Sequence, residues 1–72
     1  MNQKPPQVAS MTEIGVLIRN RRHAQGLTQR DLADVCGFGF RFISELERGK
    51  ESVEAGRVLR VLKELGLRIT IE

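Results

Sequence analysis

The sequence predicts an all-α domain of four helices, followed by a short C-terminal strand. Four segments carry apolar residues at helical spacing, and each ends at or just before a glycine. After Gly66 the pattern changes to strict alternation of apolar and polar residues, which is typical of a strand with one buried face. We therefore divide the chain into a disordered lead-in (1–10), a helical domain (11–66) and a strand (67–72).

Local signals place the first helix. We expect it to begin near Met11, because Ser10 and Glu13 have the spacing of a capping box. Gly26 supplies a left-handed stop. The apolar residues between these ends recur at helical spacing and predict one buried face: Ile14, Leu17 and Ile18.

Two short helices follow, separated by a glycine. Thr28 and Asp31 repeat the capping pattern, so the second helix begins there and runs to about Cys36. Gly37 breaks it, and the third helix is expected over 40–47. Two short helices joined by a glycine-containing turn are the sequence mark of a helix-turn-helix.

The last helix and the segment after it predict a dimer. The helix is expected over 53–65, with Ser52 as its N-cap, and Leu67, Ile69 and Ile71 then alternate with polar residues. A lone strand leaves its backbone groups unpaired, and a helical domain offers no sheet edge to receive it. We expect the strand to pair with its copy in a second subunit, forming a homodimer. The alternatives are a frayed tail or half of a binding surface for another protein.

The basic residues are mostly arginine and partly clustered. The net charge is +3, and nine of the twelve basic residues are arginines. Four of them (Arg19, Arg21, Arg22 and Arg30) lie within twelve residues that contain His23 but no acid. Such a cluster suits a phosphate backbone, and the alternative is a solvated helix face.

Other features argue against several classes of protein. The single cysteine, Cys36, excludes an intramolecular disulfide, and no Cys/His cluster suggests a metal site. We expect this cysteine to be a buried small hydrophobe. The apolar runs are too short to span a bilayer and residues 1–10 do not resemble a secretory segment, so we expect a cytoplasmic protein without a membrane partner. No nucleophile and base are arranged for catalysis, so we expect neither an enzyme nor a cofactor.

The stretch 26–50, GLTQRDLADVCGFGFRFISELERGK, resembles the lambda-repressor-like, XRE-type helix-turn-helix family. The resemblance covers roughly 12–66. The ending, a fourth helix and then an alternating strand, is more specifically similar to the HipB-type antitoxins, in which that strand pairs between two subunits. The residues that carry the family resemblance are Leu27-Thr28-Gln29, Asp31-Leu32-Ala33, Gly37, Ile43-Ser44 and Leu46-Glu47-Arg48-Gly49-Lys50.

The resemblance implies that the start of the third helix meets base edges in the DNA major groove. Here those positions are Gly39, Phe40, Arg41, Ser44 and Glu45. Arg41 is the expected direct reader of a guanine, with phosphate neutralisation as the alternative. Family members usually have a small hydroxyl residue and a polar residue where this chain has Gly39 and Phe40. Phe40 would therefore either meet a thymine methyl group or fill a gap between helices, whereas the next phenylalanine along the chain is expected in the core.

The resemblance also implies two further roles. The residues at the phosphate-binding positions are Arg22, Thr28, Gln29, Arg48 and Lys50. Arg22 and Glu47 match a pair that forms a partly buried ion pair in some phage repressors. A structural role therefore competes with phosphate binding by Arg22.

Together these features predict a transcriptional repressor that binds a palindromic double-stranded DNA operator. The resemblance to HipB-type antitoxins implies that it autoregulates its own expression and binds a HipA-type kinase toxin. Two other hypotheses remain. One is a stand-alone phage-type or restriction-modification regulator without a toxin, and the other is a protein-interaction module that no longer reads DNA.

Overall fold

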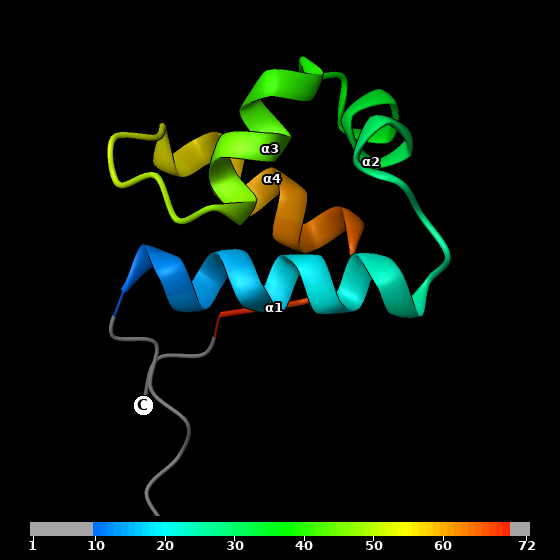
Figure 1. Cartoon of the computed structure of the whole chain (residues 1–72), viewed down its shortest axis with the longest axis horizontal. Helices are drawn as coiled ribbons and strands as arrows, with labels where there is room; N and C mark the ends of the chain where they lie inside the picture. Colours follow the sequence, from blue (N-terminus) through cyan, green and yellow to red (C-terminus); the bar gives the residue numbers. More distant parts are fainter. Residues whose placement is uncertain (1–9, 70–72) are drawn as a thin grey trace, which may run out of the picture.

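The computed structural model describes residues 10–69. This part of the chain contains the four predicted helices and no strand. Figure 1 shows α1 along the lower side of the molecule, with α2, α3 and α4 above it. Of these, α3 packs on α1, and α2 packs on α3 and α4. Within this part, no helix is long and apolar enough to cross a membrane. The helices are α1 Met11–Ala24, α2 Gln29–Cys36, α3 Phe40–Glu47 and α4 Ala55–Glu64.

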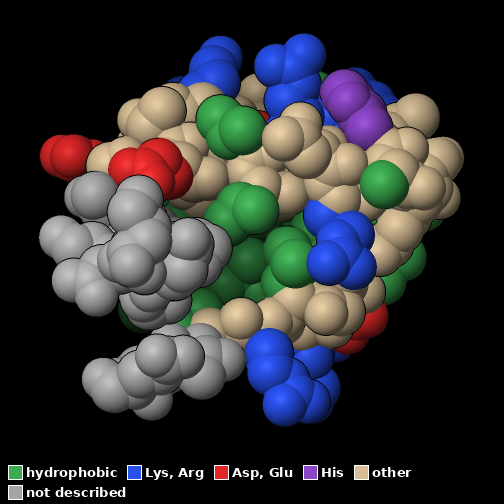
Figure 2. All heavy atoms as spheres, turned by 90° about the horizontal axis from the view of Figure 1, so that it is seen from below, with side chains coloured by type: hydrophobic (Ala, Val, Ile, Leu, Met, Phe, Trp, Pro, Cys, Tyr) green, Lys and Arg blue, Asp and Glu red, His purple; other side chains and the backbone are tan. Residues whose placement is uncertain are grey.

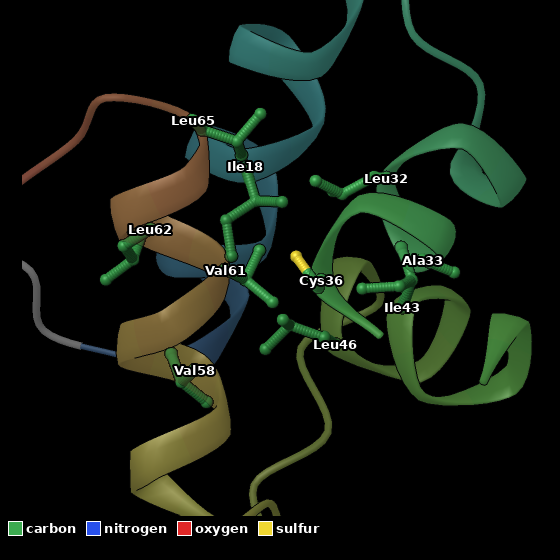
Figure 3. Close-up of a cluster of buried hydrophobic side chains, with 10 residues drawn as sticks. All are labelled: Ile18, Leu32, Ala33, Cys36, Ile43, Leu46, Val58, Val61, Leu62 and Leu65. Carbon is green, nitrogen blue, oxygen red and sulfur yellow. The ribbon is translucent and has the colours of Figure 1, made fainter. Parts of the chain in front are cut away.

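One hydrophobic core holds the four helices together. It is built from side chains of every helix and from the residue that follows α4, and they converge in the centre of the molecule (Figure 3). Cys36 is 4% exposed and lies within this core, as predicted. Phe42 is partly buried against it. The buried members are Ile18, Leu32, Ala33, Cys36, Ile43, Leu46, Val58, Val61, Leu62 and Leu65.

The turn between α2 and α3 depends on Gly37. This residue has a φ of 75°, a left-handed conformation that side chains with a Cβ atom rarely adopt. Its N–H donates to the carbonyl of Asp34 (3.2 Å), and the N–H of Phe38 donates to that of Ala33 (2.9 Å). These two bonds satisfy carbonyls at the end of α2 and reverse the chain, so that α3 begins only three residues later.

A close backbone contact positions α3 on α1. A Cβ atom added to Gly15 would lie 2.5 Å from the carbonyl oxygen of Glu47 and 2.7 Å from that of Leu46. Only a glycine therefore allows the middle of α1 to approach the end of α3 so closely. This contact fixes where the end of α3 lies on α1, and the periodicity of the sequence gave no sign of it.

Two features differ from the expected helix pattern. The fourth helix begins at Ala55 with Glu54 as its N-cap, so Ser52 does not cap it. Residues 53 and 54 stay outside the helix, and Val53 packs its side chain against the core. Leu17 was expected on a buried face, but it remains exposed on α1.

The segment after α4 is not a strand in its described part. Residues 67–69 have no regular secondary structure. The N–H of Leu67 donates to the carbonyl of Leu62 (2.8 Å), and its side chain packs against the core of its own subunit, whereas Ile69 is 58% exposed. The two residues therefore do not share one outward face. Ile71 and residues 1–9 of the expected lead-in lie outside the described residues.

Candidate nucleic-acid interface

The first turn of α3 presents an open, basic surface. Gly39 is the N-cap, and no side chain hydrogen-bonds to the free N–H groups at this end of the helix. A Cβ atom on Gly39 would meet nothing within 4 Å, so the backbone here is accessible. The side chain of Arg41 is 89% exposed. A ligand can therefore approach both the guanidinium and the helix end.

A half-buried carboxylate organises the cations on this surface. Glu45 accepts a hydrogen bond from Lys50 (Nζ–Oε1, 3.2 Å) and lies 3.4 Å from the Nε atom of Arg41. The hydrogen bond from Lys50, helped by the charge of Arg41, lowers the pKa of Glu45. The carboxylate is therefore ionised at neutral pH and links two of the predicted DNA contacts. Ser44, the residue before Glu45, is partly buried.

The start of α2 is held by the predicted capping box. The Thr28 hydroxyl accepts from the N–H of Asp31 (3.0 Å), and the Thr28 N–H donates to Oδ2 of Asp31 (2.9 Å). The hydrogen bond from the Thr28 N–H to the carboxylate lowers the pKa of Asp31. Thr28, Gln29 and Phe40 line one groove between the end of α1 and the starts of α2 and α3. The structure thus brings two predicted phosphate ligands and one predicted base contact to the same place.

A buried ion pair lies beneath this groove. Arg22 and Glu47 are only 7% and 9% exposed. Arg22 donates from Nε to Oε2 of Glu47 (2.7 Å) and from Nη2 to Oε1 (3.0 Å), while its Nη1 donates to the carbonyl of Leu27 (2.8 Å). Gln29 adds a third bond to Glu47 (3.0 Å). Because all three nitrogens of the guanidinium bind protein groups, the geometry favours the structural role of Arg22 over phosphate binding.

The protonation of this pair follows from its hydrogen bonds. Burial opposes ionisation of Glu47, but the bonds from Arg22 and Gln29 together outweigh it and lower the pKa of the carboxyl group. The bond to Glu47 in turn raises the pKa of Arg22. Both groups are therefore charged, and they connect the end of α1, the start of α2 and the end of α3.

The remaining predicted phosphate ligands follow α3. Arg48 is the C-cap residue of that helix and is exposed. Lys50 is also exposed and is held by Glu45. They follow the C-terminal end of α3, whereas Thr28 and Gln29 share a groove with Phe40, the first residue of that helix.

One contact in this groove was not predicted from the sequence. The guanidinium carbon of Arg30 lies 4.5 Å from the centre of the Phe40 ring, a cation–π arrangement. Arg30 was visible in the sequence only as one member of the arginine cluster. Its partner is ten residues away and on another helix, so no local spacing could have indicated the pair.

Comparisons with known proteins agree with this geometry. A family model described as Helix-turn-helix matches residues 18–71. The uncharacterized HTH-type transcriptional regulator y4mF of Sinorhizobium fredii (strain NBRC 101917 / NGR234) is 45% identical over 65 residues, which cover 90% of this chain and 86% of that protein.

Two solved structures have a similar fold. A chain of the HipA-HipB-O2-O3 complex superposes with a TM-score of 0.83 and 24% identity, over 93% of this chain and 94% of that chain. The restriction-modification controller protein C.AhdI from Aeromonas hydrophila superposes with a TM-score of 0.72 and 28% identity, over 81% of this chain and 88% of that chain. With the family match over most of its length, the chain belongs to the helix-turn-helix family of transcriptional regulators, in agreement with its XRE-type motif.

Proposed function

We propose that this protein is a sequence-specific DNA-binding repressor that acts as a homodimer. The observation that carries the proposal is the exposure of Arg41 in the first turn of the second helix of the motif. An arginine that binds O6 and N7 of guanine is the commonest specific contact in the major groove. Glu45, one turn further along α3, holds Arg41 on this face and can itself accept a hydrogen bond from a cytosine amino group.

Other residues of the same surface have supporting roles in this proposal. Gly39 allows the DNA to approach the backbone at the start of α3, and Ser44 follows one turn after Phe40. The ligands proposed for the phosphates on either side of α3 are Thr28, Gln29, Arg48 and Lys50. Arg22 acts indirectly, because its pair with Glu47 ties the end of α1 to the end of α3, and Gln29 joins the start of α2 to the same carboxylate.

The test compares two arginines in similar pairs. Arg41 and Arg60 each pair with a glutamate four residues later on an exposed helix surface. Arg60 lies on α4, so the Arg60→Ala variant is a control for the loss of one positive charge. Duplexes selected from a random library by the wild-type protein serve as probes. Arg41→Ala should bind them about 5- to 150-fold more weakly, corresponding to about 1–3 kcal/mol, and lose its preference at one base pair.

The outcome depends on comparing selected and random DNA. Arg60→Ala should change neither affinity nor preference by a large factor. Lys50→Ala should weaken binding to all sequences alike and reduce the slope of log affinity against log salt by about one. An Arg41→Ala protein that loses affinity equally for selected and random DNA would show that Arg41 only neutralises phosphate.

Exposed apolar side chains support the homodimer. Leu17 on α1, Leu59 on α4 and Ile69 after α4 all remain exposed in the single subunit. Figure 2, which looks at the molecule from below α1, shows hydrophobic side chains gathered in a hollow on this face. Pairing of the C-terminal segments, including Ile71, across a two-fold axis would cover apolar surface and present two α3 helices to a palindrome. Half-sites would then lie about 34–36 Å apart, or at a multiple of that distance.

The dimer is tested by a point change at Ile69. Deleting the segment from residue 67 onward would also uncover the core, because Leu67 packs against it. Ile69→Asp leaves Leu67 in place and should give a monomer by sedimentation, with an unchanged helical spectrum. Val35→Asp is the matched control, since Val35 is exposed to a similar extent but lies on α2. A dimeric Ile69→Asp protein that binds its palindrome normally would exclude this interface.

We further propose that the protein is the autoregulating antitoxin of a HipA-type kinase toxin. Its fold matches a chain of the HipA-HipB-O2-O3 complex over nearly the whole length of both. The fold match to C.AhdI supports the alternative of a stand-alone regulator. Co-purification with a kinase encoded by an adjacent gene tests the choice. A kinase that binds and is inhibited favours the antitoxin, and an adjacent kinase that does not bind favours the alternative.

A further inference from the structure

Phe40 is a large apolar side chain on the surface, outside the hydrophobic core. It is the first residue of α3 and is 41% exposed. Phe38 and Phe42, its neighbours in the sequence, instead pack against the core and contact each other edge to face, with ring centres 5.3 Å apart. The Phe40 ring faces the groove that Thr28 and Gln29 also line. It therefore lies at the junction between the proposed base contacts and the proposed phosphate contacts.

The guanidinium of Arg30 lies over this ring. Its guanidinium carbon lies 4.5 Å from the ring centre, and both residues line the same groove. A guanidinium that stacks on a ring through its flat face still has N–H donors around its edge. The pair is thus assembled before any ligand arrives, which reduces the cost of ordering two side chains on binding.

We infer that Phe40 and Arg30 form one specificity unit, in which the ring contacts the 5-methyl group of a thymine and Arg30 binds a neighbouring phosphate. The inference rests on the proposed DNA-binding function. An exposed phenyl ring has no group to donate to or accept from a base edge. The thymine methyl is the one apolar feature of the major groove of unmodified DNA, so it is the feature that this ring complements.

The test removes only the methyl group from the DNA. In the duplex selected by the wild-type protein, each thymine of one half-site is replaced singly by deoxyuridine. At one or two positions the wild-type affinity should fall about fourfold, the factor that corresponds to about 0.8 kcal/mol for one buried methyl group. The Phe40→Ala variant should bind the thymine and deoxyuridine duplexes equally. Arg41→Ala, the matched control, should retain the fourfold difference.

Arg30 is tested by two measurements with Arg30→Gln, which retains a polar side chain but removes the charge. The slope of log affinity against log salt should fall by about one, and the preference for thymine over deoxyuridine should shrink because the ring loses its support. Arg60→Gln removes the same charge away from this surface and should change neither quantity. Phe40→Leu, which keeps an apolar side chain, should keep part of the preference for thymine over deoxyuridine. That result would show that a protein substituted at this position still folds and binds.

The outcomes separate this inference from the proposed function. Tight, sequence-dependent binding by the wild-type protein with no position sensitive to deoxyuridine would overturn the role of Phe40 and leave DNA binding intact. A deoxyuridine effect that persists in Phe40→Ala would assign the methyl contact to another residue and also overturn it. Failure to select any duplex would contradict the proposed function itself.

Discussion

Replacing Glu47 by alanine removes the carboxylate that Arg22 binds through two nitrogen atoms. Three hydrogen bonds disappear: two from Arg22, at 2.7 and 3.0 Å, and one from Gln29. Arg22 is 7% exposed, so water cannot readily replace the lost partner. It retains its bond to the carbonyl of Leu27, but its charge is then buried and uncompensated. The variant should therefore be strongly destabilised.

The free energy of unfolding should fall by about 3–5 kcal/mol, the usual cost of removing one partner of a buried ion pair. This loss is consistent with two charge-assisted hydrogen bonds at about 1.5–3 kcal/mol each. Small domains have a total stability near the lower end of about 5–15 kcal/mol, so this loss is a large fraction of it. At about 4–8 °C per kcal/mol, the melting temperature should fall by more than about 12 °C.

Urea unfolding, followed by circular dichroism, measures this loss. Glu64→Ala is the matched control, because it breaks the exposed Arg60–Glu64 pair and should cost less than about 1 kcal/mol. A double variant, Arg22→Met with Glu47→Leu, removes both charges and should be more stable than Glu47→Ala alone. The reasoning is refuted if Glu47→Ala costs no more than the control, or if the double variant is no better than the single one.

Three further predictions concern stability and reactivity. Gly15→Ala should destabilise the protein by at least about 1–3 kcal/mol in urea unfolding, because its Cβ would clash with the carbonyl of Glu47; a more stable variant would contradict this contact. Folding lowers the pKa of Glu47. The contribution of this carboxylate to the free energy of unfolding is therefore complete above its unfolded pKa of about 4.3, and it is lost as the pH falls through its lower pKa in the folded state. As the pH is lowered, the free energy of unfolding should therefore decrease less steeply for Glu47→Gln than for the parent protein. Identical slopes against pH would argue against a lowered pKa of Glu47. Burial raises the pKa of the Cys36 thiol, so a thiol reagent should label it slowly in buffer and quickly in urea; equal rates would contradict its burial.

Helix ends were predictable where the signal acts within a single turn. The capping box of Thr28 and Asp31 forms as expected, and α2 and α3 end where their glycines indicated. These signals depend only on backbone geometry and on partners three or four residues away. Ser52 failed as a cap because the start of α4 also depends on Val53, which packs against the core. A local signal is unreliable where long-range packing competes with it.

In the candidate site, too, the local features could be predicted from the sequence pattern and the contacts between helices could not. The position of Arg41 at the start of α3 followed from the motif, since it needs only the order of residues in one short helix. The pairing of Arg22 with Glu47 across 25 positions was expected only from the resemblance to phage repressors. The contact of Arg30 with Phe40 was not expected at all. Side chains on different helices meet only once crossing angles and separations are set.

By itself, the sequence determined four helices, their approximate ends, the turn at Gly37 and the face on which Arg41 lies, because caps, glycines and periodicity operate over a few residues. The tertiary structure alone decided three other features. It placed the backbone of α3 against Gly15, stacked Arg30 on Phe40, and turned Leu67 toward its own core. Each of these depends on the distance between elements that are remote in the chain. That distance is set by how the whole core packs, which no local pattern encodes.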